Sequence, residues 1–212
     1  NPYWKWTLDA TRFYTAAAKN RFIVAMPDII EGLDILSALF GNQELLTFLV
    51  DCPEEIHRLL DQLDNLYWKA FDPIYEIIKD ERSGNAFMAF QIWGPGRTLK
   101  SQCDFSAMIS PDMFAEFVCP HLERQCDRAD HVIFHLDGPS CIRHLPHLLK
   151  IKKLAGIQWI PGAGAVKEDP ADPYWWNSVW RPVAEAGKGM LALGGVSPTS
   201  AENFIREFGR RG

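Results

Sequence analysis

The sequence lacks the features that mark several large classes of protein. No apolar run is long enough to cross a bilayer, and no stretch has the pattern of a secretory signal. Basic residues form no run or stripe, and 22 Lys and Arg against 27 Asp and Glu give a net charge of -5. We therefore expect no membrane span and no nucleic-acid partner, and the cytoplasm is the default location.

The cysteines have neither the number nor the spacing of a common structural motif. The five cysteines are odd in number, and no two of them form a Cys-x-x-Cys pair. This pattern argues against a disulfide framework and against a four-cysteine zinc site. We expect most of them to be small buried thiols.

What the chain does contain is a regular alternation of predicted strands and helices. Its 212 residues, 47% hydrophobic and 23% charged, are enough for a substantial core and typical of a globular enzyme. Short apolar runs predict strands at residues 22–26, 85–90, 132–137, 156–159 and 189–193. Helical spacing and capping signals predict helices at residues 2–19, 33–40, 42–50, 53–78, 110–126, 141–149, 173–186 and 199–208.

This alternation predicts an α/β fold of parallel strands joined by helical crossovers, either a barrel or a doubly wound sheet. No predicted strand is followed by the Gly-x-Gly-x-x-Gly of a dinucleotide-binding sheet, and every strand ends in polar residues, Pro or Gly. Chemistry at the carboxyl ends of many strands favours the (β/α)8 TIM barrel. Five strands cannot close such a barrel, so we expect residues 1–212 to be a partial barrel in one domain, with early strands and the last strand outside this sequence.

The strand at residues 132–137 organises the prediction, because it runs from apolar residues into His135-Leu136-Asp137-Gly138. Residues two apart on a strand point the same way, so His135 and Asp137 should face one side together. That arrangement suits a two-ligand metal site or an acid/base pair. The alternative is a buried core histidine beside an aspartate that caps the next helix.

Other strand ends supply further candidates. Asp28 and Glu31 could act as base or ligand, although Asp28 could equally cap a helix. The remaining candidates would line a pocket that stacks on and hydrogen-bonds a flat or one-carbon substrate: Gln91, Trp93, Gln158, Trp159 and Gly194. Tryptophans in barrel loops are also often packing residues.

Seven short motifs, in order along the chain, carry a family resemblance. They are Pro27 with Leu33-Asp34-Ile35-Leu36 and Gly41, Cys52-Pro53-Glu54-Glu55, Trp93-Gly94, Ser110-Pro111-Asp112-Met113-Phe114 with Pro120, His135-Leu136-Asp137-Gly138, Gly156-Ile157-Gln158-Trp159 with Pro161-Gly162, and Gly194-Gly195-Val196-Ser197-Pro198. Together they resemble the uroporphyrinogen decarboxylase superfamily. The resemblance implies an eight-stranded barrel with its active-site cleft at the carboxyl ends of the strands, and related decarboxylases pair as homodimers.

The superfamily has two relevant branches, and the residues are nearer the cobamide-dependent methyltransferases. In that branch the corresponding strand ends in His-x-Cys-Gly, whose His and Cys bind zinc, and a corrinoid protein is the partner. His135 and Gly138 match, while Asp137 stands in place of the Cys. The resemblance therefore implies a divalent metal on His135 and Asp137, with a third ligand from elsewhere and a harder ligand set than thiolate would give.

The decarboxylase branch, which uses no cofactor, is the alternative within enzymes. The tyrosine that this branch uses just past its Ala-Pro turn has no counterpart near Pro27, and the strand ends offer chiefly Arg97 and Arg143 as cations for a polycarboxylate tetrapyrrole. We therefore expect a metal-assisted methyltransferase in which Asp28 and Glu31 orient or deprotonate the substrate. A third hypothesis is a non-catalytic barrel that binds a corrinoid protein or a small ligand.

Overall fold

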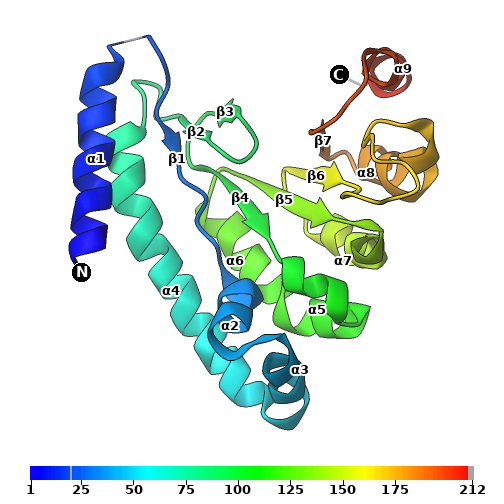
Figure 1. Cartoon of the computed structure of the whole chain (residues 1–212), viewed down its shortest axis with the longest axis horizontal. Coiled ribbons are helices and arrows are strands. Elements are labelled where there is room, and N and C mark those ends of the chain that lie inside the picture. Colours follow the sequence, from blue (N-terminus) through cyan, green and yellow to red (C-terminus); the bar gives the residue numbers. More distant parts are fainter. Residues whose placement is uncertain (20, 210–212) are drawn as a thin grey trace.

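The computed structural model describes residues 1–19 and 21–209 and has an α/β architecture (Figure 1). Its strands are β1 (Ala25–Met26), β2 (Asn85–Phe87), β3 (Ile92–Gly94), β4 (Thr98–Gln102), β5 (His131–Asp137), β6 (Gly156–Ile160) and β7 (Gly189–Ala192). Its α-helices are α1 (Pro2–Ala18), α2 (Gly32–Phe40), α3 (Asn42–Asp51), α4 (Pro53–Ile78), α5 (Pro111–Phe117), α6 (Cys119–Arg128), α7 (Leu145–Lys150), α8 (Arg181–Glu185) and α9 (Pro198–Phe208).

The strands form two sheets. One is a four-stranded sheet in the order β4-β5-β6-β7, in which every neighbouring pair is parallel. The other has the order β1-β2-β3, with β1 parallel and β3 antiparallel to β2. Helices connect the successive parallel strands, as parallel pairing requires. The predicted α/β class with parallel strands is therefore confirmed.

One side chain joins the two sheets. The carboxamide of Asn85, at the start of β2, accepts a hydrogen bond from the backbone N–H of Thr98 and donates one to its carbonyl, both at 2.9 Å. Asn85 is only 1% exposed, so these bonds are shielded from water. The side chain thus replaces the backbone ladder between β2 and β4, where regular pairing is interrupted.

The helices lie along one side of the parallel strands, and the strand burial pattern follows from this (Figure 1). Along β5, exposure alternates residue by residue. Val132, Phe134 and Leu136 are buried on the helix side, where the Phe134 ring meets Phe114 of α5 at 6.0 Å. The other face of β5 therefore carries the half-buried residues, His135 and Asp137 among them.

Local signals explain where the helices begin. Ser110 accepts a hydrogen bond from the backbone N–H of Met113 and so caps α5, and Ser197 caps α9 in the same way through Ser200. Pro53 occupies the first turn of α4, where its missing N–H costs nothing. The predicted helix at residues 110–126 is two helices, because Pro120 cannot continue the hydrogen-bonding ladder of α5.

Several predicted boundaries are wrong. The strand predicted at 22–26 is reduced to Ala25–Met26. The strand predicted at 85–90 ends at Phe87, and the chain turns back through Gln91, at φ 52°, into antiparallel β3. The helix predicted at 173–186 consists of a 3-10 turn, a π-helical turn and the short α8. Strand β4 was not predicted at all.

The structure bears on two expectations from the sequence, that the cysteines form no disulfides and that no helix spans a membrane. All five cysteines are free, and Cys103, Cys126 and Cys141 are buried. Among the described residues, no single helix has both the length and the apolar character needed to cross a bilayer. Helices α2 and α3 pass that test only as a pair, with a bend of 114° between them.

Candidate metal centre and cleft

The carboxyl ends of the parallel strands surround an open cleft of about 540 Å³. The walls come from the ends of β4, β5 and β6, the segment after β7, the turn between β2 and β3, and the segment after β1. The lining residues are Asp28, Ala89, Phe90, Gln91, Lys100, Gln102, His135, Gln158, Ile160, Leu193 and Gly194. Five of the sequence candidates, Asp28, Gln91, His135, Gln158 and Gly194, are thus brought to one place.

The register of the parallel sheet sets the layout of the cleft floor. Gln102 on β4 pairs with His135 on β5, which in turn pairs with Gln158 on β6. Because side chains in register on neighbouring strands point to the same face, these three residues form one row. Asp137 lies two residues further along β5, in register with Ile160.

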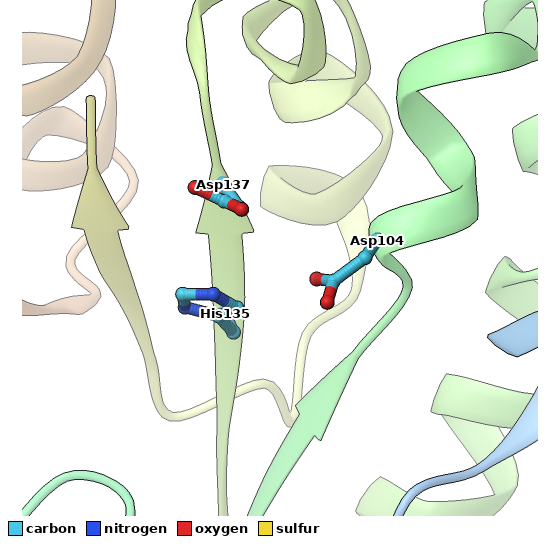
Figure 2. Close-up of side chains that lie close together, drawn as sticks. All are labelled: Asp104, His135 and Asp137. Carbon is cyan, nitrogen blue, oxygen red and sulfur yellow. The ribbon is translucent and has the colours of Figure 1, made fainter. Parts of the chain in front are cut away.

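Three side chains gather where β4 and β5 end. Figure 2 shows Asp137 beyond His135 on β5, with the carboxylate of Asp104 reaching toward them from the segment that follows β4. One ligand atom from each of Asp104, His135 and Asp137 lies within 4.8 Å of the others. Two ligands of one zinc ion at about 2.0–2.2 Å can be at most about 4.4 Å apart. Small side-chain rotations would therefore suffice for all three to bind one ion.

The hydrogen bonding of His135 suits a metal ligand. Its Nδ1 is bonded to the carboxamide oxygen of Gln158. An amide oxygen only accepts, so Nδ1 must carry the proton, and neutral imidazole then keeps a free lone pair on Nε2. Metal-binding histidines typically have their second ring nitrogen fixed in this way. Gln158 is 2% exposed, so its orientation is held by packing.

Hydrogen bonds with neighbouring residues fix the position of Asp104. Asp34 of α2 accepts hydrogen bonds from the backbone N–H groups of Asp104, at 3.0 Å, and Phe105, at 2.9 Å. Gln102 donates to the Asp104 carboxylate at 3.2 Å. Partial burial raises the pKa of Asp104, and the charges of Asp34 and Asp137 raise it further, while His135 and Lys100 lower it. A cation between Asp104 and Asp137 would relieve the repulsion between their two carboxylates.

Lys100 is the buried cation of the cleft. Its side chain is 2% exposed and pairs with the carboxylate of Asp28, which is 40% exposed. The same ammonium group donates to the carboxamide oxygen of Gln102. Asp28 therefore caps no helix; it neutralises a lysine that would otherwise be costly to bury.

Glu31 does not lie in the cleft with the other candidates. It is 8% exposed, among side chains of α4 and α6 on the helix side of β4. It accepts hydrogen bonds from the backbone N–H of Gln102 at 3.0 Å and from the Gln125 carboxamide. Burial raises the pKa of Glu31 to about 7, although hydrogen bonds from Ser101, Gln125 and Gln102 oppose the shift. The expectation that Glu31 faces the substrate beside Asp28 is corrected.

Neither candidate tryptophan lines the cleft. Trp159 is fully buried on the other face of β6, against Trp175 with ring centroids 5.3 Å apart. Trp93 lies on antiparallel β3 opposite Ala86, where its indole N–H donates to Asp80 at 2.9 Å. It borders an apolar hollow at the amino ends of the parallel strands, not their carboxyl ends. The expected substrate-stacking role thus has no geometric support for either residue.

Sequence reasoning missed Lys100, Gln102 and Asp104, because it missed β4. The segment Thr98-Leu99-Lys100-Ser101-Gln102 contains one strongly apolar residue and shows no alternation that predicts a strand. The strand is nevertheless buried, since the side chains of Lys100 and Ser101 find partners at Asp28 and Glu31.

Comparison with known protein families, with characterised proteins and with solved structures gives no match for this chain. The fold and the site define an α/β protein with a polar cleft at the carboxyl ends of parallel strands and a candidate metal centre beside it. The resemblance to the uroporphyrinogen decarboxylase superfamily depends on the sequence motifs alone.

Proposed function

We propose that this protein is a divalent-metal-dependent enzyme whose reaction is methyl transfer, in the cleft at the carboxyl ends of its parallel strands. The observation that carries the metal site is the cluster of Asp104, His135 and Asp137, whose ligand atoms lie within 4.8 Å of one another. Methyl transfer comes from the family resemblance, which also makes a corrinoid protein the proposed partner.

The order of the strands supports a barrel as the complete fold. Chain order and spatial order agree from β4 to β7, and Asn85 continues the wall from β4 to β2 and β1. This sequential, parallel arrangement with helices on the outside is what part of a (β/α)8 barrel would have. The inner face would then be the face that carries His135 and Asp137.

The ligand set indicates what kind of group the metal would activate. One imidazole and two carboxylates form a hard oxygen-rich set, which suits zinc, iron or manganese. Such a metal lowers the pKa of a bound water, hydroxyl or thiol group and so makes it a better nucleophile. Among the described residues no cysteine belongs to the cluster, so they supply no thiolate to soften the metal. We therefore favour a hydroxyl or water over a thiol as the activated group.

The other cleft residues have supporting roles in this proposal. Gln158 fixes the tautomer of His135, and Asp34 fixes the backbone of Asp104. Asp28, at the rim and 40% exposed, is the remaining carboxylate that can orient the substrate. Gln91 and Gly194 line the opposite parts of the cleft.

Zinc titration by calorimetry tests the metal site. We expect one zinc ion per chain, with about 100-fold weaker binding for His135→Ala and a clear loss for Asp104→Asn. Asp9→Asn, an exposed aspartate on α1, is the matched control and should bind as the wild type does. Cobalt substituted for zinc should give a spectrum without a thiolate charge-transfer band. Absence of metal binding, or unchanged affinity in His135→Ala, would contradict the proposed site.

Activity requires a separate assay. Metal-loaded protein should demethylate methylcobalamin in the presence of hydroxyl acceptors, and His135→Ala should abolish that activity. If metal-free protein instead decarboxylates uroporphyrinogen, the methyl-transfer proposal is wrong.

A further inference from the structure

Lys100 is a group that the proposed metal chemistry does not use. It lines the cleft, yet its side chain is 2% exposed. A lysine loses much side-chain freedom and hydration when it is buried, so its position needs a compensating interaction. Asp28 provides part of that compensation.

The hydrogen-bonding capacity of Lys100 is not exhausted. An ammonium group has three N–H donors. Asp28 and Gln102 accept from it, and the described residues supply no third acceptor. Since Lys100 borders the cleft, the remaining donor is available to a ligand bound there.

The charges around the cleft define what that ligand should be. Asp104 and Asp137 would be balanced by a divalent metal, and Lys100 is balanced by Asp28. With the metal bound, Asp34 is the carboxylate that remains beside the site, and it accepts hydrogen bonds from the backbone N–H groups of Asp104 and Phe105. Hydrogen bonds between a charged donor and a charged acceptor are about twice as strong as neutral ones.

We infer that the cleft binds a substrate bearing a carboxylate, and that Lys100 is the residue that recognises it. This inference rests on the proposed metal-dependent function, because the metal supplies the charge balance. Gln102 contacts both Lys100 and Asp104, so it links the carboxylate site to the metal site on one strand. The substrate would reach the metal with one end and Lys100 with the other.

Succinate is a suitable probe, with succinamide as its uncharged counterpart. Binding to the full chain would be measured by calorimetry, with and without saturating zinc. We expect succinate to bind, more tightly with zinc, and succinamide to bind at least about tenfold more weakly. Lys100→Met should weaken succinate binding about tenfold but should not weaken zinc binding, because it removes a positive charge near the ligand Asp104.

A second variant separates recognition from a structural role. Asp28→Asn removes the carboxylate that competes for Lys100, so succinate should bind more tightly than to the wild type. If Lys100 served only to hold the fold, both variants would weaken binding, and thermal unfolding would show whether each is folded.

The two proposals can fail separately. A protein that binds zinc but binds succinate equally well in Lys100→Met overturns the carboxylate inference alone. A protein that binds no zinc overturns the metal site, and the zinc-free titration then decides on Lys100. Absence of succinate binding under both conditions overturns the inference about substrate class.

Discussion

The buried carboxyl group of Glu31 makes the stability of this protein depend on pH in a predictable direction. Burial raises its pKa from 4.5 to about 7 in the folded state. Below pH 4.5 the Glu31 carboxyl group is protonated in both the folded and the unfolded state, so its titration does not reduce the free energy of unfolding. Between these values the unfolded chain releases the proton while the folded protein keeps it, so stability falls as pH rises, by about 1.4 kcal/mol per pH unit.

The full loss is reached above pH 7, where Glu31 is ionised in both states. The shift corresponds to about 3 kcal/mol, a large share of the stability of a typical domain. Glu31→Gln has no proton to lose and should not show this dependence. The amide can replace the protonated carboxyl, because the Gln125 oxygen has no hydrogen-bond partner and can accept from it after a flip of the Gln125 carboxamide.

Urea unfolding at pH 4.5, 6, 7 and 8 would measure the effect, since the difference between variant and wild type cancels the other titrating groups. The free energy of unfolding of Glu31→Gln should gain about 3 kcal/mol on the wild type between the lowest and highest pH. Glu202→Gln, at an exposed position on α9, is the control and should run parallel to the wild type. A Glu31→Gln profile parallel to the wild type would show that Glu31 is not held as described.

Two further predictions concern side chains that support the fold and the site. Gln158→Leu removes the acceptor for His135 Nδ1 and should weaken zinc binding about 10–100-fold in calorimetry, whereas unchanged affinity would mean that Gln158 does not set the tautomer. Asn85→Ala leaves the buried N–H and carbonyl of Thr98 without partners and should cost roughly 2–4 kcal/mol in urea unfolding. The exposed Asn65→Ala is its control, with a cost under about 0.5 kcal/mol; equal costs would contradict the bridging role of Asn85.

The parts of the fold that the sequence predicted are those in which local pattern and burial agree. Strand β5 alternates buried and half-buried residues, so its two-residue period placed His135 and Asp137 on one face. Helix α4 begins at Pro53, with acidic residues in its first turn and a long apolar stripe, and its predicted limits match the structure. In such elements the local signal and the tertiary contacts favour the same structure.

The parts that were missed are those in which polar groups are buried by long-range partners. Glu31 contacts Gln125, which is 94 residues away in sequence, and no local pattern near Glu31 indicates this. The turn through Gln91 that produces β3 requires a positive φ at a non-glycine residue, which sequence preferences do not favour. Trp159 was expected to line the same pocket as Gln158, although adjacent residues of a strand face opposite sides.

Strand β4 connects these omissions to the function. Its side chains alternate between the cleft, which receives Lys100 and Gln102, and the helix side, where Ser101 lies near Glu31. A strand composed for packing alone would carry apolar residues at these buried positions. Polar residues there need hydrogen-bond or ion-pair partners that offset the cost of removing them from water. The local sequence pattern does not predict β4, because the partners that satisfy its polar side chains are distant in sequence.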